Sequence, residues 1–297
     1  FNIAGSTGYS LLYSNHADTS FSRLPFSSVF QKNLTYSGSM GFAWNPIENL
    51  KLSTNIASGY RVPNIDDLSK IFESSAGTLI VPNQNLKPEK TITTDFGITI
   101  WKKQRMQFEN TVYYTRFFDA IVTSPYTLNG KDSVLYNGSM SSVMANQNQR
   151  RAYIYGYSGV LRARLISNIW LYGSINYTYG RIKTDTIDAP LDHIPPVFGR
   201  GGTQYLSEKL FIDFYCIFNS KKSIRNYYLN GEDNEIYAPA NGMQGWYTIN
   251  FKASYQIKKT YTVQAGVENI LDSQYRTFAS GINAPGRNVY ISLKYRF

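Results

Sequence analysis

The residues of this sequence that could do chemistry are few and far apart. Its two histidines are His16 and His193, and Cys216 is its single cysteine, so the chain forms no internal disulfide. A metal site needs several His, Cys or carboxylate ligands at short spacing, and the sequence has no such cluster. A nucleophile needs a base held beside it, and both histidines fall in segments that we expect to be loops. We therefore predict no enzyme activity, no cofactor and no metal.

Two adjacent acids, Asp66 and Asp67, follow Pro63 closely and could form an acid–base or metal-binding pair. Proline ends a strand, because it cannot donate to the hydrogen-bond ladder. Asn64 is of a residue type that caps the first turn of a helix through its side-chain oxygen. We therefore predict a short capped helix here, in which the acids have no chemical role.

Aromatic, polar and charged side chains gather in two segments without strand periodicity, 118–152 and 219–246. The first is rich in Ser, Asn, Gln and Tyr, and the second holds Lys, Arg and Tyr before the acids Glu232, Asp233 and Glu235. Such residues suit recognition of a polar ligand, although a solvated loop without a binding role has a similar composition. The candidate substrate-binding residues are Tyr126, Arg225, Tyr227, Tyr228 and Arg276.

The composition differs from that of a typical soluble core. Charged residues make up 17% of the chain and aromatic residues 15%, with 25 Tyr and 17 Phe. A barrel in lipid needs aromatic girdles at both water interfaces and few charges between them. The net charge of +10 comes from scattered Lys and Arg. Scattered cations favour a polar lumen or phosphorylated lipid head groups as their partners, and nucleic acid is not expected.

The elements that must position these residues are strands. No stretch approaches the roughly 18 consecutive apolar residues of a membrane helix, so any crossing must be made by strands. Tyr247–Ile257 alternates strictly between apolar and polar residues, over a length that suits a tilted strand in a bilayer. About twelve such segments are expected in all: Asn2–Leu12, Tyr36–Trp44, Leu50–Tyr60, Thr91–Trp101, Met106–Phe117, Tyr155–Leu165, Ile169–Tyr179, Phe198–Tyr205, Leu210–Phe218, Tyr247–Ile257, Tyr261–Ile270 and Asn288–Phe297.

The charged residues indicate which face of these strands meets water. Lys252, Glu268 and Lys294 all lie in the polar rows. A Lys or Arg on the lipid face costs about 2–4 kcal/mol at the bilayer midplane, so the polar rows should line an aqueous lumen. A soluble sandwich would alternate too, but its apolar rows would be buried inside.

The lengths of the connections separate a barrel from a sandwich. Short turns at 45–49, 102–105, 166–168, 206–209 and 258–260 alternate with long connections at 13–33, 61–90, 118–152, 180–197, 219–246 and 271–287. Short periplasmic turns and long extracellular loops are typical of outer-membrane barrels. The sequence therefore predicts an all-β fold, a transmembrane antiparallel up-and-down β-barrel whose long loops, apart from the short capped helix, have no secondary structure of their own.

Four segments resemble the boxes of TonB-dependent outer-membrane receptors: GYRVPNIDDL at 59–68, VPNQNLKPEK at 81–90, ENILDSQY at 268–275 and PGRNVYISLKYRF at 285–297. The first two look like the FRAP-like and NPNL-like elements of that family, and the last two like its penultimate strand end and its final strand. We expect the box residues to be structural and not ligand-binding. They are Arg61, Pro63, Asn83, Asn85, Leu86, Pro88, Glu89, Asn269, Tyr275, Gly286 and Phe297.

The resemblance implies a 22-stranded barrel with a plug in its lumen. Residues 1–297 would be the C-terminal portion of such a barrel, and the plug domain and roughly ten earlier strands would precede them. No basic start and apolar run open the sequence, so residue 1 is not expected to be the natural start.

The function implied by the resemblance is active, TonB-energised import of a scarce nutrient across the outer membrane of a Gram-negative bacterium. The chain would supply barrel wall and extracellular loops. Its partners would be the TonB complex (through the plug), outer-membrane lipid with lipopolysaccharide, the nutrient and, over the loops, a surface lipoprotein. Haem importers carry a ligand histidine between the first two boxes, and 61–82 contains none. An iron–siderophore or a cobalamin-like chelate is therefore favoured.

Two alternatives remain at this point. A self-contained barrel of about twelve strands would be a passive porin, and a soluble all-β adhesin would bury its apolar rows. Pairing of Asn2–Leu12 with Asn288–Phe297 would close the barrel and favour the porin. If these strands do not pair with each other, the sheet must continue in other sequence, because an open edge is not viable in hydrocarbon.

Overall fold

The computed structural model describes residues 1–15, 28–75, 77–103, 105–149, 151–183, 188–228, 240–257 and 260–296. The large sheet contains β1 (Asn2–Asn15), β2 (Ser28–Ile47), β3 (Leu50–Arg61), β6 (Glu89–Lys102), β7 (Met106–Phe118), β11 (Ala152–Ile166), β12 (Ile169–Lys183), β13 (Asp188–Pro190), β14 (Phe198–Leu206), β15 (Leu210–Asn219), β18 (Trp246–Ile257), β19 (Tyr261–Glu268) and β20 (Asn288–Tyr295). The connections contain α2 (Ile65–Ser69), β4 (Phe72–Ser75), β5 (Thr78–Val81), β8 (Ala120–Pro125), β9 (Ser133–Tyr136), β10 (Ser139–Gln149), β16 (Lys222–Ser223), the 3-10 helix η1 (Ile224–Asn226) and β17 (Gly242–Met243).

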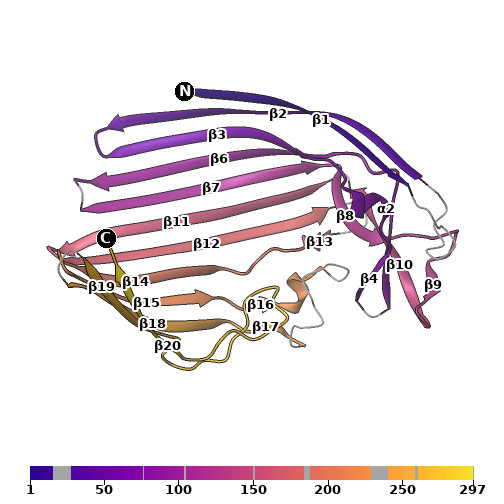
Figure 1. The fold of residues 1–297 in the computed structure, drawn as a ribbon. Coiled ribbons are helices and arrows are strands. Elements are labelled where there is room, and N and C mark those ends of the chain that lie inside the picture. The colour runs from indigo at the N-terminus through magenta and orange to yellow at the C-terminus, as the bar shows by residue number, and fades with distance from the viewer. Residues whose placement is uncertain are drawn as a thin grey trace.

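The large sheet is antiparallel, and its strands follow one another in the order β1-β2-β3-β6-β7-β11-β12-β14-β15-β18-β19-β20, with β13 added beside β12. Figure 1 shows it as a curved wall, with short turns at one end and the long connections gathered at the other. Every one of the twelve strands predicted from alternation is present, so the predicted up-and-down order is confirmed. Among the described residues, no helix is long and apolar enough to cross a membrane.

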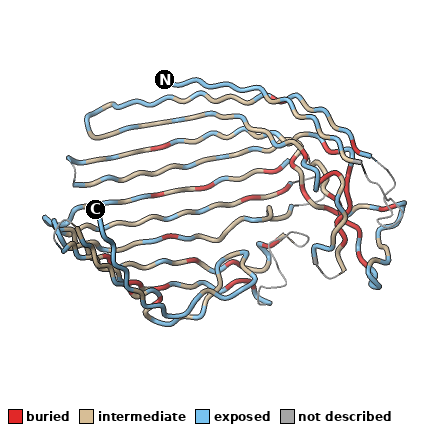
Figure 2. Tube along the Cα trace, in the orientation of Figure 1, coloured by how far each residue is buried: buried red, intermediate tan, exposed pale blue. Residues whose placement is uncertain are grey.

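The apolar rows of this sheet are exposed on its outer face. In β18, Tyr247 is 55% exposed and Tyr255 47%, whereas Thr248 and Asn250 between them are 2% and 3% exposed. Figure 2 shows the same change from exposed to less exposed residues along neighbouring strands. A sandwich would bury the apolar row against a second sheet, and the opposite is found here. The prediction that apolar rows face outward and polar rows face the lumen is confirmed.

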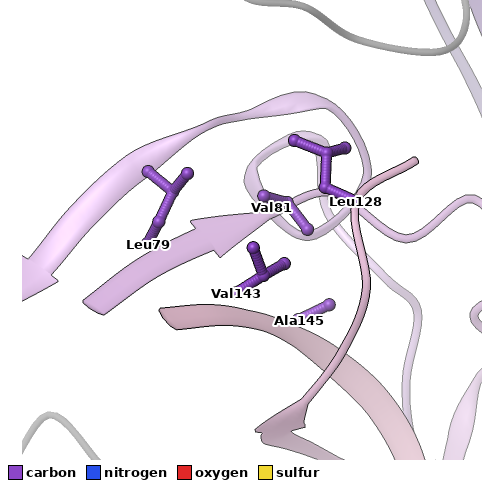
Figure 3. Packing of buried hydrophobic residues seen from close by; sticks show 5 residues of the cluster. All are labelled: Leu79, Val81, Leu128, Val143 and Ala145. Carbon is purple, nitrogen blue, oxygen red and sulfur yellow. The ribbon is translucent and has the colours of Figure 1, made fainter. Parts of the chain in front are cut away.

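The buried core lies in the connections at the loop end. Leu79, Val81, Leu128, Val143 and Ala145 pack together there (Figure 3). All but Leu128 come from β5 and β10 of a five-stranded sheet in which β10 pairs with β5, β8 and β9, and β4 pairs with β5. Leu128 lies in the connection between β8 and β9. The expectation that the long connections 61–90 and 118–152 lack secondary structure is therefore wrong. Their apolar residues bury one another in a small second sheet.

The two ends of the large sheet are open edges. β1 pairs with β2 and β20 pairs with β19, and within the described residues β1 and β20 do not pair with each other. The twelve strands therefore do not close into a ring through pairing of β1 with β20 within the described residues.

Candidate functional site at the loop end

The first two box segments are joined at the loop end by a polar network centred on Asp67. The predicted capped helix is confirmed, because Asn64 caps α2 and accepts a hydrogen bond from the backbone N–H of Asp67 at 2.8 Å. Pro63 is buried just after β3 ends at Arg61. The buried carboxylate of Asp67 accepts hydrogen bonds from Arg61 Nη1 at 3.0 Å, the Asn64 N–H at 3.0 Å and Asn146 Nδ2 at 2.7 Å.

The second box is held by β10 and by the start of β2. Asn83 Nδ2 donates to the backbone oxygen of Asn146 at 2.9 Å, and Asn83 Oδ1 accepts from the Asn85 N–H at 3.0 Å. Leu86 is buried against Val29 and Leu68. Pro88 is half-buried between this turn and β6.

Glu89, the last of these box residues, accepts a hydrogen bond through Oε2 from the Ile121 N–H at 2.8 Å. The side-chain amide of Asn148 in β10 forms two hydrogen bonds with the backbone of Lys87. Its Nδ2 donates to the Lys87 carbonyl oxygen at 2.9 Å, and its Oδ1 accepts from the Lys87 N–H at 2.8 Å. The side chains and backbone of both boxes therefore hold protein segments together.

The C-terminal boxes shape the turn that precedes β20. Asn269 is 3% exposed, and its amide exchanges two hydrogen bonds with Ser273, each at 2.9 Å. The Tyr275 ring lies 4.2 Å from that of Trp246. A Cβ at Gly286 would lie 2.7 Å from the Asp272 carboxylate, which accepts from the Arg287 N–H at 2.8 Å. Phe297 lies outside the described residues.

The candidate substrate-binding residues occupy different environments. Tyr227 is 5% exposed, with its ring 6.3 Å from that of Phe278. The Tyr228 hydroxyl donates to the Thr123 backbone oxygen at 2.6 Å. Tyr126 packs against the core of the small sheet, and Arg276 Nε donates to Asn283 Oδ1 at 3.2 Å. Arg225 is exposed on η1. Tyr227 and Tyr228 thus join their own connection, 219–246, to the connections 271–287 and 118–152. Arg225 is the candidate most open to a ligand.

The remaining predicted loop residues are placed as follows. His193 is exposed, has a φ of 57° and lies with Nε2 3.9 Å from the Asp192 carboxylate. His16, Glu232, Asp233 and Glu235 lie outside the described residues. Among the residues that the structure describes, no group of three or more His, Cys, Asp or Glu could hold a metal ion.

Lys222 is a cation whose burial no local pattern of the sequence predicts. It is 4% exposed, and its Nζ donates to the Ile194 oxygen at 2.7 Å. The same ammonium lies 4.1 Å from the ring centroid of Phe278 and 4.5 Å from that of Tyr227. It also lines a cavity of about 250 Å³ together with Tyr179, Arg181 and Lys221. Tyr177 lines the cavity as well, and Arg181 is paired with Asp188 at 2.8 Å. The two lysines and the two tyrosine rings have the chemistry to hold an anionic, partly aromatic group.

A second feature missed from the sequence is a charged cluster on the lumen face. Asp213 is 3% exposed and accepts from Tyr172 Oη at 2.8 Å and from Arg200 Nη2 at 3.1 Å. The Arg200 guanidinium lies 4.1 Å from the Tyr215 ring centroid. The available signal was an aspartate in the middle of the apolar segment Leu210–Phe218. A buried carboxylate in such a segment needs partners from neighbouring strands.

A curved antiparallel sheet with an apolar outer face, a polar inner face and folded connections at one end defines the wall of a transmembrane β-barrel. Residues 8–270 match the family described as TonB dependent receptor-like, beta-barrel, and the chain belongs to this family.

Relatives with known names share this barrel region. The chain is 24% identical over 304 residues to the hemoglobin and hemoglobin-haptoglobin-binding protein of Haemophilus ducreyi, covering 86% of this chain and 31% of the relative. It is 22% identical over 303 residues to the probable TonB-dependent siderophore receptor PirA of Acinetobacter baumannii, covering 86% and 39%. The chain therefore spans about a third of the length of these curated relatives.

Solved structures show the same fold. The copper transporter OprC superposes with a TM-score of 0.72 at 19% identity, over 90% of this chain and 40% of that one. A variant of the ferric enterobactin receptor PfeA from Pseudomonas aeruginosa superposes with a TM-score of 0.68 at 17% identity, over 90% and 42%. At these identities, the likeness establishes the architecture of the wall.

Proposed function

We propose that the whole protein is an outer-membrane importer of a scarce nutrient, energised by TonB, in which this chain supplies barrel wall and extracellular loops. The observation that carries the proposal is the asymmetry of the wall. Apolar residues cover its outer face, polar residues line its inner face, and one end carries folded loops with a cation-rich cavity. Family membership adds support, because the matched family is that of TonB-dependent receptors. The chain is not expected to catalyse a reaction.

The proposed arrangement makes residues 1–297 the C-terminal portion of a 22-stranded barrel. The unpaired outer edges of β1 and β20 support it, because unsatisfied backbone groups cost several kcal/mol each in hydrocarbon. Other strands of the same protein would complete the ring, and a plug domain in its lumen would transmit the pull of TonB. The passive porin remains the alternative function to be tested.

The favoured substrate is an iron–siderophore or a cobalamin-like chelate. Relatives at 22% identity include the probable siderophore receptor PirA and the vitamin B12 transporter BtuB of Photobacterium profundum. The segment 61–82, which joins the first two boxes, has no histidine to ligate haem iron. Among the loop residues, Arg225 is exposed and Lys222 lines the cavity, so an anionic chelate matches the local charge.

The test is uptake of a radiolabelled ferric siderophore by cells that carry the intact protein, with and without an uncoupler of the inner-membrane proton gradient. Active import predicts saturable uptake that the uncoupler abolishes. Uptake that rises linearly with concentration and ignores the uncoupler would establish the porin instead.

A variant pair tests the role of the loops in the same assay. Arg225→Gln removes an exposed cation of η1 and should raise the half-saturation concentration several-fold, about tenfold per 1.4 kcal/mol lost. Lys131→Gln removes an exposed cation at the end of another loop hairpin and serves as the matched control. Equal behaviour of the two variants would exclude Arg225 from the binding site.

A further inference from the structure

The outer face of the sheet carries cations at the loop end of β6, β7 and β12, and β11 lies between the last two with a tyrosine. Register places Ile92, Arg116, Tyr153 and Arg181 side by side in one row across β6, β7, β11 and β12. Lys90 lies one step further toward the loops, opposite Phe118. Both Lys90 and Arg116 are exposed. These residues share the strand face of outward-pointing Phe96 and Val112, which are 44% and 50% exposed.

A row of tyrosines lies immediately below the cations, toward the middle of the sheet. Register places Tyr114, Tyr155 and Tyr179 side by side there. The Tyr153 ring lies 6.2 Å from that of Tyr114 and 6.4 Å from that of Tyr155, and Tyr155 and Tyr179 are 5.1 Å apart. The Arg116 guanidinium lies 5.0 Å from the Phe118 ring centroid. Tyrosines with an apolar body and a polar tip are typical of the membrane–water interface.

The height of this row matches the upper surface of the apolar layer. Arg116 follows Met106, the first residue of β7, by ten positions, 116 minus 106. A strand rises ~3.3 Å per residue and is tilted ~40° in outer-membrane barrels, so ten residues cover about 25 Å. That value is about the height of the outward apolar band. The cations therefore lie where the phosphates of a lipid headgroup would be.

The charges on this face are unbalanced. Among the described residues of β6, β7, β11, β12 and β13, the acid on the outward face is Asp188, whose carboxylate lies 2.8 Å from Arg181 Nε. The other acids of these strands, Glu89, Asp95 and Glu109, belong to the inward rows. Neither Lys90 nor Arg116 forms an ion pair with a described residue. The patch is thus positive and open to an anion.

We propose that the patch of Lys90, Arg116, Tyr153 and Arg181 binds a phosphate of the lipopolysaccharide headgroup in the outer leaflet. This inference rests on the proposed function, which places the loop end outside the cell. The charge, the tyrosine row and the height all fit a phosphorylated lipid. The opposite end of β6 and β7 differs. There Ile100 pairs with Phe108 and Lys102 pairs with Met106, so Lys102 is the one cation in these two outward pairs of described residues.

The test is the thermal unfolding midpoint of the intact receptor, purified in micelles and titrated with lipopolysaccharide, dephosphorylated lipopolysaccharide or inorganic phosphate. Lipopolysaccharide should raise the midpoint. In the Lys90→Gln/Arg116→Gln double variant the concentration for half the effect should rise at least tenfold. In the single variant Lys90→Gln, at an exposed position, the lipopolysaccharide concentration for half the effect should rise by a smaller factor. This variant tests the proposal if the double variant does not fold.

The matched control is Lys102→Gln/Arg105→Gln, which removes two exposed cations from the short-turn end and should respond as the parent does. An unchanged response of the Lys90→Gln/Arg116→Gln variant, or an equal response to the dephosphorylated lipid, would overturn the proposal. Stabilisation by inorganic phosphate alone would also overturn it, in favour of a free-anion site. Siderophore uptake in the same cells separates this proposal from the transport function, since either can fail while the other stands.

Discussion

Asp67 carries the polar network of the loop end, and its neighbour Asp66 provides a natural comparison. Hydrogen bonds to a charged group contribute about 1.5–3 kcal/mol, and a capping interaction about 1 kcal/mol. Arg61 is 43% exposed and can be rehydrated when its partner is removed, so its share is smaller. Asp66 is 64% exposed and lies 3.8 Å from Lys70 in a surface pair.

We expect Asp67→Ala to lower the free energy of local opening of 65–69 and 83–86 by about 2.5–4 kcal/mol, the sum of the lost capping-box bond from the Asn64 N–H and the lost charged hydrogen bond from Asn146. Asp66→Ala should change it by less than about 0.5 kcal/mol. Hydrogen–deuterium exchange of these amides in the intact receptor measures both. Similar exchange rates in the two variants would show that the hydrogen bonds of Asp67 do not hold the boxes together.

At this scale the sequence allowed part of the site to be predicted. The cap at Asn64 could be recognised because capping depends on residues three positions apart. The bond between Asp67 and Asn146 spans 79 positions, and no local pattern announces it. Lys222 presents the same difficulty, because its burial depends on Ile194 and Phe278 from other connections. Contacts between loops require the fold before they can be found.

At the scale of elements, strict alternation predicted the long strands because each has one face in lipid and one toward the lumen. The small sheet escaped prediction for a physical reason. Leu79, Ile80 and Val81 of β5 are all buried, so that strand has no alternation. It pairs in parallel with β10, across more than 60 positions. The sequence does contain one local signal of this sheet, the Asn-Gly pair at 137–138, which is typical of a two-residue hairpin turn. Both residues have the positive φ that such a turn requires.

Two neighbouring glycines of β14 test how tightly the lumen face is packed. A Cβ at Gly202 would lie 2.6 Å from the Phe214 backbone oxygen and 2.7 Å from Tyr215 Cβ, beside the Asp213 cluster. A Cβ at Gly201 would find its nearest contact at 3.5 Å. Gly202→Ala should therefore destabilise the barrel by about 1–3 kcal/mol, as overpacking does, and Gly201→Ala should be nearly neutral. The thermal unfolding midpoint of the intact receptor reports both, and equal midpoints would contradict the close packing of β14 against β15.

At the scale of the whole molecule, the position of the apolar surface separates a membrane wall from a soluble protein. Ile291 is 79% exposed and Leu293 68%, although both belong to the final strand of the sheet. Buried apolar clusters occur in the loop sheet and its neighbours, where water surrounds the protein. A chain with its apolar residues outside along the strands and inside at the loop end is suited to two solvents, lipid around the wall and water around the loops.

Adjacent residues in the middle of β7 test this distribution directly. Val112 is 50% exposed and belongs to the outward row, whereas Thr111 belongs to the inward row. We expect Val112→Lys to destabilise the folded receptor in lipid by about 2–4 kcal/mol, because the ammonium would lie near the bilayer midplane. Thr111→Lys should cost much less, because its ammonium stays in the polar lumen. Urea unfolding of the intact receptor in lipid vesicles measures the difference. A larger loss of stability for Thr111→Lys would show that the row of Thr111 faces the lipid. That result would contradict the barrel on which the proposed transport depends.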